Sequence, residues 1–168
     1  RDPARMTHDS DGPWYYQQID LGFNYRMTEL QGALGVSQMA RLDTYVAKRH
    51  AIADRYDAAL DGLPVVCPWR RPDSYSGLHL YVVLVQLDKA RATHRQVFES
   101  LREQGIGVNL HYIPVHTQPY YQALGFKAGD FPQAEHYYTR AISLPMYPNL
   151  QAAEQEQVVS ALRKAMLA

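Results

Sequence analysis

The sequence predicts an α+β fold, with a few strands, helices over one face of the sheet and a long helical stretch leading into it. Three observations support this prediction. Apolar residues recur at helical spacing between residues 28 and 62, residues 78–85 are almost continuously apolar or aromatic, and a second helical pattern spans residues 152–167. With 168 residues and 46% hydrophobic content, the chain can bury one substantial core.

The long helical stretch begins at Thr28, which forms a capping box with Gln31, three positions further on. A second run of helically spaced residues follows and ends at Gly62. The members of this run are Leu42, Tyr45, Val46, Arg49, Ile52, Ala53, Tyr56 and Leu60. Two helices and one bent helix fit the pattern equally. The small residues Gly32 and Gly35 cost helix propensity, which favours a close approach of the first part to another surface, such as a second subunit.

The strands are expected further along the chain. Residues 78–85 predict a strand that is covered on both faces. A helix of about three turns follows, because Thr93 and Gln96 make a second capping box and Gly105 is a natural stop. Residues 106–110 then alternate between apolar and polar types, which is the period of a half-buried strand. We expect this second strand to pair with the first.

The last part of the chain is expected to contain two helices. Asp130 is placed to cap a short helix that starts near Pro132. Residues 143–148 should be extended, because they contain two prolines. The final helix covers residues 152–167. Its predicted inner face consists of Val158, Val159, Leu162 and Met166.

Composition excludes several classes of function. Lysine plus arginine equals aspartate plus glutamate at 17 each, so no net field attracts the chain to nucleic acid or to an anionic membrane. The lone cysteine, Cys67, cannot form an internal disulfide and fits a reducing compartment. No secretory signal or long apolar run is present, so we expect a soluble cytoplasmic protein. The polar start at Arg1 resembles a cut through a longer chain.

A polar loop precedes the first helix. Residues 22–27 read Gly-Phe-Asn-Tyr-Arg-Met, and the amide of Asn24, the guanidinium of Arg26 and the free N–H groups of the following helical turn favour an anion, above all a phosphate. None of the four lysines stands where a buried, reactive amine is expected. These lysines are Lys48, Lys89, Lys127 and Lys164. The sequence therefore predicts only part of an active site.

Four segments resemble the carboxy-terminal part of the DegT/DnrJ/EryC1/StrS sugar aminotransferases. They are Gly-Phe-Asn-Tyr-Arg-Met-Thr-Glu-Leu-Gln at residues 22–31, Leu-Asp at 42–43, His-Tyr-Ile-Pro-Val-His at 111–116, and Ala-Ile-Ser-Leu-Pro at 141–145. The resemblance covers nearly the whole chain. Residues 111–121 and 129–132 most resemble the branch of this family that acts in pseudaminic acid synthesis.

The resemblance implies a fold-type I enzyme that depends on pyridoxal 5′-phosphate. This chain would be its small carboxy-terminal domain, with a mostly antiparallel sheet. The implied reaction moves an amino group, usually from glutamate, onto a UDP-linked 4-keto-6-deoxy sugar, within a homodimer. In the family, the Schiff-base lysine and the aspartate on the pyridinium nitrogen lie in the large amino-terminal domain. We therefore expect this chain to carry no catalytic residue, and to be inactive and without bound cofactor when alone.

The resemblance also assigns three parts and several contacts. Residues 1–27 would be a lead-in and trans-acting loop, residues 28–62 an interdomain helical region, and residues 63–168 the small domain. Asn24 and Arg26 match the segment that reaches the cofactor phosphate of the neighbouring subunit. Arg26 could instead meet the diphosphate of the substrate, or form an ion pair with Glu29 or Asp20. The residues that match the lining of the nucleotide-sugar pocket are His111, Tyr112 and His116.

Other interpretations of these residues stay open. His111 and His116 could be hydrogen-bonded structural groups, and a zinc site is not expected because no third Cys, Asp or Glu ligand lies near this pair. The tyrosine pairs at 15–16, 120–121 and 137–138 favour packing over sugar stacking. The pair at 70–71, two arginines between prolines, should lie on a solvated surface. Two alternative functions are a free-standing nucleotide-sugar or carbohydrate-binding module and a structural dimerisation domain.

Overall fold

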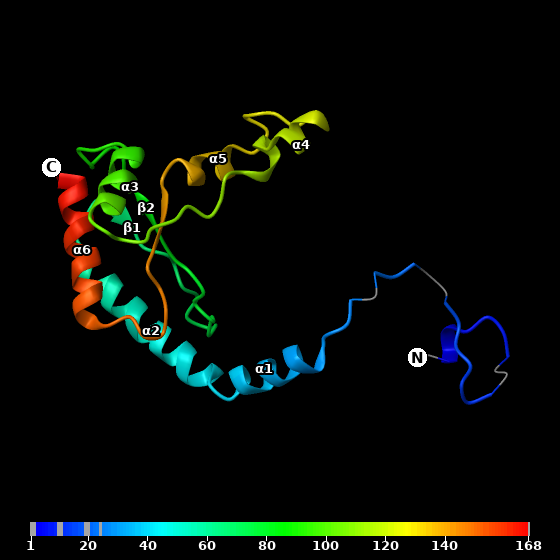
Figure 1. Ribbon diagram of the computed structural model, residues 1–168. Coiled ribbons are helices and arrows are strands. Elements are labelled where there is room, and N and C mark those ends of the chain that lie inside the picture. Colours follow the sequence, from blue (N-terminus) through cyan, green and yellow to red (C-terminus); the bar gives the residue numbers. More distant parts are fainter. Residues whose placement is uncertain (1–2, 10–11, 19–20, 24, 168) are drawn as a thin grey trace. The chain divides into compact units, whose positions relative to one another are not determined.

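The computed structural model describes residues 3–9, 12–18, 21–23 and 25–167. It separates the chain into two compact units, Arg1–Ala40 and Arg41–Ala168, and the second is called the carboxy-terminal unit below. The first unit contains a short 3₁₀ helix, η1 (Pro3–Arg5), and the helix α1 (Glu29–Met39) (Figure 1).

The start of α1 confirms the first capping box. The backbone N–H of Gln31 donates to Thr28 Oγ1 over 3.3 Å, and the backbone N–H of Thr28 donates to Gln31 Oε1 over 3.0 Å. No residue of α1 is buried, and Leu30 and Leu34 are 82% and 60% exposed. The described residues therefore give α1 a capped start but no buried face.

A second helix, α2 (Leu42–Ala59), follows after Ala40, so the helical stretch is two helices rather than one bent helix. Only the second half of α2 reaches the core. Its buried residues are Ile52, Ala53 and Tyr56, followed by Leu60 beyond the helix end. The first half of the predicted stripe, from Leu42 to Arg49, is exposed or half-buried.

Three antiparallel strands form the sheet in the order β1-β2-β3. They are β1 (Val65–Val66), β2 (Tyr81–Val85) and β3 (Ala141–Leu144). In the register, Val65 lies opposite Val85 and Tyr81 lies opposite Leu144. The α+β prediction with a mostly antiparallel sheet is confirmed.

One face of the sheet carries the core. Tyr81, Val83 and Val85 of β2 are fully buried, and Ile142 and Leu144 of β3 lie on the same face because they pair with Val83 and Tyr81. The helices that complete this core are α2, α3 (His94–Glu103) and α6 (Ala152–Leu167). Helix α6 contacts both α3 and α2 (Figure 1). The predicted inner face of the last helix is confirmed, since all four of its residues are buried.

The prediction for residues 106–110 was wrong. These residues form no strand, and they do not pair with residues 78–85. Instead, Asn109 makes a single bridge to Ser143 of β3, with hydrogen bonds of 3.3 and 2.8 Å in the two directions. The physical reason is that β2 is the central strand, with β3 along one edge and β1 at Leu84 and Val85 on the other, and residues 106–110 lie beside β3 instead. The first predicted strand is also shorter than expected, since β2 begins only at Tyr81.

The helix α5 (Pro132–Tyr138) begins where it was expected, but its cap is not Asp130. Phe131 occupies the N-cap position, and Asp130 Oδ2 instead accepts from the backbone N–H of Lys127 at 2.9 Å. The cap of α3 is as predicted, with Thr93 and Gln96 in a capping box. Gly105 ends that helix with φ +77°, a left-handed conformation that favours glycine.

Candidate functional site

The loop before α1 is described in part. Asn24 and Asp20 lie outside the described residues. Arg26 is exposed, and the structure shows no ion pair between it and Glu29, which is also exposed. An exposed guanidinium directly ahead of a capped helix can bind a phosphate group of a partner molecule, because it forms no ion pair with a carboxylate among the described residues.

A pyridoxal site also needs a reactive amine, and the lysines do not fit that role. All four lysines of the sequence are described and exposed. A lysine amine that forms a Schiff base at neutral pH is normally desolvated or placed beside another cation. The four lysines of this chain therefore lack the desolvated setting that such an amine normally has.

The segment that follows α3 places His111 against the sheet. The ring Nδ1 of His111 lies 2.7 Å from Ser143 Oγ on β3, and Ser143 is 3% exposed. Tyr112 follows across a cis peptide bond, and its ring meets the His111 ring edge-on at 4.6 Å. Tyr112 itself is 70% exposed, so its hydroxyl is accessible to a ligand.

His116 is the more deeply placed histidine, with 7% of its surface exposed. It lies in the short 3₁₀ helix η2 (Val115–Thr117), just before α4 (Pro119–Ala123). Its Nε2 lies 2.8 Å from Glu135 Oε1 on α5, and its ring lies 4.9 Å from the ring of Phe131. The polar contact shown for His116 is therefore made within the fold. This agrees with the interpretation of His116 as a hydrogen-bonded structural group.

Glu135 joins two parts of this region. Its Oε1 also accepts from the backbone N–H of Gly129 at 2.7 Å. This backbone hydrogen bond, followed by the contact with His116, holds the pKa of the Glu135 carboxyl below its ordinary value. The segment 111–116 is thus attached at two points to residues 135–143, once through His116 and once through His111.

The partners of the two histidines were missed by sequence reasoning. The sequence places Ser143 in an extended segment that also resembles the family, and Glu135 in a short helix, without indicating a contact for either. No local sequence signal links Ser143 to His111, 32 residues away, or Glu135 to His116, 19 residues away. If residues 106–110 are placed beside β3 rather than beside β2, the contact between His111 and Ser143 can be expected, because His111 directly follows residues 106–110.

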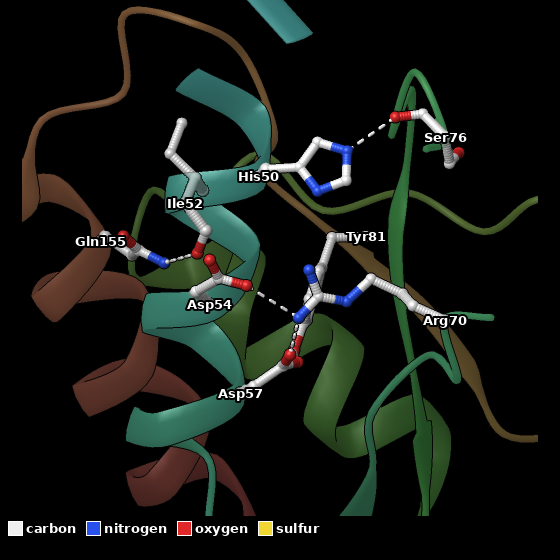
Figure 2. A network of polar contacts seen from close by, with 8 residues as sticks. All are labelled: His50, Ile52, Asp54, Asp57, Arg70, Ser76, Tyr81 and Gln155. Atoms are coloured by element: carbon white, nitrogen blue, oxygen red, sulfur yellow. Dashed lines mark hydrogen bonds and ion pairs between the residues drawn. The ribbon is translucent and has the colours of Figure 1, made fainter. Parts of the chain in front are cut away.

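The prediction of a solvated surface was wrong for Arg70. Its side chain is 28% exposed and donates to Asp54 Oδ1 at 2.9 Å and to Asp57 Oδ2 (Figure 2). Asp57 Oδ1 also accepts from the buried hydroxyl of Tyr81 at 2.6 Å. Burial, and then the hydrogen bond to Asp57, raise the pKa of the Tyr81 hydroxyl. Arg71 differs, because it is 63% exposed and pairs with the exposed Asp73.

Two further observations concern the described residues. No group of three or more His, Cys, Asp or Glu side chains among them is arranged to hold a metal ion. Among the helices of this part of the chain, none is long and apolar enough for a membrane span.

Comparison with known proteins gives a consistent picture. Residues 5–163 match the model of the DegT/DnrJ/EryC1/StrS aminotransferase family. The spore coat polysaccharide biosynthesis protein SpsC of Bacillus subtilis is 39% identical over 163 residues, which are 95% of this chain and 42% of SpsC. The chain therefore spans about two fifths of the length of the curated relatives it matches.

Solved structures agree with this match. The aminotransferase PseC of Helicobacter pylori, involved in the biosynthesis of pseudoaminic acid, has a TM-score of 0.81 and 27% identity, covering 94% of this chain and 42% of PseC. DesV of S. venezuelae has a TM-score of 0.81 and 30% identity, covering 94% and 42%. The putative sugar aminotransferase Spr1654 of Streptococcus pneumoniae, solved in its PLP-form, has a TM-score of 0.82 and 25% identity, covering 91% and 39%.

The family match covers nearly the whole chain, and the fold agrees with that of the carboxy-terminal part of these enzymes. The chain is thus a partial homologue of sugar aminotransferases that use pyridoxal 5′-phosphate. It belongs to the DegT/DnrJ/EryC1/StrS aminotransferase family.

Proposed function

We propose that this chain is the carboxy-terminal part of a sugar-nucleotide aminotransferase and that it contributes binding contacts rather than the reactive amine. One observation carries the proposal. The family match spans residues 5–163, yet all four lysines of the chain are exposed. The Schiff-base lysine must then come from the large amino-terminal domain, and the chain alone does not aminate a substrate.

The cofactor contacts come from the loop before α1. Asn24 and Arg26 hold the phosphate of pyridoxal 5′-phosphate in the neighbouring subunit of a homodimer, Asn24 as an uncharged donor and Arg26 as a cation. When bound, pyridoxal 5′-phosphate supplies an electron sink for amino-group transfer. The exposure of Arg26 supports this role, because a group that acts on another subunit has to lie at the surface of its own.

The substrate contacts come from the segment 111–116. Tyr112 offers an exposed hydroxyl to the nucleotide sugar, while His111 and His116 shape the same wall from their anchored positions. Arg26 can also reach the diphosphate. The acceptor is a UDP-linked 4-keto-6-deoxy sugar and the donor is glutamate, as the resemblance of residues 111–121 and 129–132 to the pseudaminic acid branch of the family implies.

The test compares two proteins, the 168-residue chain and the polypeptide extended upstream of Arg1 by its amino-terminal domain. The extended dimer should show the visible absorbance of bound pyridoxal 5′-phosphate and glutamate-dependent amination of the UDP-4-keto sugar, and the chain alone should show neither. A folded, dimeric extended protein without both signals would overturn the proposal.

Calorimetry separates the proposal from the binding-module alternative. A free-standing module should bind UDP-sugars without any large domain, so saturable binding by the 168-residue chain would favour that alternative. A pure dimerisation domain predicts a different result. In the extended protein, Asn24→Ala would then leave cofactor retention unchanged, whereas our proposal predicts weaker retention at an unchanged dimer mass.

A further inference from the structure

Ser143 of β3 carries a hydroxyl, yet only 3% of its surface is exposed. Its neighbours Ile142 and Leu144 face the core. Successive side chains of a strand point to opposite faces of the sheet, so the Ser143 side chain lies on the face away from this core. A buried hydroxyl without a partner is unfavourable. The partner of Ser143 is His111, whose Nδ1 lies 2.7 Å from Oγ, so this polar contact forms outside the core.

Ser143 holds residues 109–111 through both its backbone and its side chain. Its backbone N–H donates to the carbonyl oxygen of Asn109 at 2.8 Å, and its own carbonyl oxygen accepts from the backbone N–H of Asn109 at 3.3 Å. The bridge fixes the chain at Asn109, and the hydroxyl contact fixes the ring of His111 two residues further on. The chain is therefore attached to the sheet directly before Tyr112.

The middle of the segment 111–116 is exposed between two attached ends. Tyr112 and Ile113 are 70% and 49% exposed, whereas His116 at the far end is buried and contacts Glu135. The ring of Tyr112 meets the ring of His111 edge-on at 4.6 Å. Such a ring contact favours one relative orientation, so the position of the Tyr112 ring depends on where His111 is held.

We propose that Ser143 is a positioning residue for the nucleotide sugar. Its hydroxyl holds the ring of His111, and through that ring Tyr112, in the position that binds the substrate. The inference rests on the proposed function, because it takes the segment 111–116 as the wall of the substrate site. It adds a role in substrate affinity for a residue that has almost no accessible surface of its own.

The test measures amination by the extended dimer, with the UDP-4-keto sugar and glutamate varied separately. Covalent amino-group transfer proceeds in two half-reactions, so kcat/KM for glutamate reports on the first and does not include binding of the sugar. Ser143→Ala should raise KM for the sugar roughly two- to tenfold, the effect of one lost hydrogen bond. We expect kcat, kcat/KM for glutamate, the cofactor absorbance and the dimer mass to stay at their wild-type values.

Three further variants separate positioning from a general structural loss. The matched control is Ser100→Ala on α3, which removes a half-buried hydroxyl that accepts from Gln104 Nε2 at 3.2 Å and should leave KM unchanged. Ser143→Cys keeps a similar shape with a weaker hydrogen-bonding group, so it should raise KM less than Ser143→Ala. In a His111→Ala background, Ser143→Ala should raise KM no further, because Ser143 acts through His111.

Three results would overturn the inference while leaving the proposed function intact. They are a wild-type KM for the sugar in Ser143→Ala, an equal fall of kcat/KM for both substrates, and effects of Ser143→Ala and His111→Ala that simply multiply. If Ser143→Ala gives no folded dimer, a wild-type KM in Ser143→Cys decides against the inference in the same way. A folded wild-type extended dimer without amination would instead overturn the proposed function, and this inference with it.

Discussion

Replacing Asp57 by alanine should destabilise the carboxy-terminal unit much more than replacing Asp73, although each carboxylate pairs with an arginine. Asp57 connects Arg70 to the hydroxyl of Tyr81, whose side chain is fully buried. Asp73 pairs with Arg71, and both of those side chains are more than 60% exposed. The two substitutions remove the same group from different surroundings.

The magnitude follows from what each change leaves behind. Without Asp57, the buried hydroxyl of Tyr81 loses its acceptor, which costs about 1–3 kcal/mol. The Arg70 contact adds at most about 1 kcal/mol, because Arg70 and Asp57 are 28% and 35% exposed and water screens the pair. We therefore expect about 1–4 kcal/mol for Asp57→Ala and about 0–1 kcal/mol for Asp73→Ala. At this chain length, 1–4 kcal/mol lowers the thermal midpoint by about 2–16 °C.

Urea unfolding followed by far-ultraviolet circular dichroism measures both free energies, and an unchanged denaturant slope shows that the unfolded states are comparable. A double-mutant cycle with Tyr81→Phe isolates the hydrogen bond, and its coupling energy should be about 1–2 kcal/mol. The reasoning is refuted if Asp57→Ala costs no more than Asp73→Ala, or if the effects of Asp57→Ala and Tyr81→Phe simply add.

Three further predictions concern packing, pH and association. Leu162→Ala, in the fully buried part of α6, should cost about 2–5 kcal/mol in urea unfolding; the control Leu167→Ala, at a side chain 45% exposed, should change little, and equal losses would contradict the assigned core face. The folded-state pKa of the Glu135 carboxyl lies below its ordinary value of 4.5. The stabilisation that the ionised carboxyl provides is therefore present above pH 4.5, and it is lost as the pH falls through the lower pKa of the folded state. The thermal midpoint of the wild type should therefore fall toward that of Glu135→Gln in acid, and a constant difference between the two would count against this assignment. Because Leu30 and Leu34 are exposed on α1, light scattering should show association that grows with concentration and weakens in the double variant Leu30→Glu, Leu34→Glu; a strictly monomeric wild-type chain would refute this.

Local sequence signals predicted the helices well. Thr28 and Thr93 each open a helix through a capping box, as their spacing to Gln31 and Gln96 indicated. These features depend on residues three positions apart, so no tertiary information is needed. The final helix could be assigned for a similar reason, because its apolar period repeats over four turns.

Strand pairing was harder to predict. The alternation of residues 106–110 does correspond to burial, since Val108 is buried and Asn109 is exposed. The segment nevertheless forms no strand and makes a single bridge, from Asn109 to Ser143. Alternation reports which side chains face the core and does not specify the partner strand. The two-residue strand β1 had no detectable period at all.

The polar contacts of the candidate site could be predicted least. Arg70 was expected in solvent because it lies in a proline-rich loop, whereas Asp54 and Asp57 on α2 bind it in the folded unit. The partners of His111 and His116 are likewise set by tertiary contacts. The residue types and the family match indicate which chemistry to expect, but which side chains meet depends on the fold.

The most direct test of the trans-acting loop is a mixed dimer of the extended protein. One variant lacks the Schiff-base lysine of the amino-terminal domain, and the other carries Asn24→Ala. If Asn24 acts on the neighbouring subunit, each mixed dimer contains one intact site, and random mixing should restore about a quarter of the wild-type amination activity. If mixing gives no activity beyond that of the two variants measured alone, while mass spectrometry shows that mixed dimers form, Asn24 does not act across the interface.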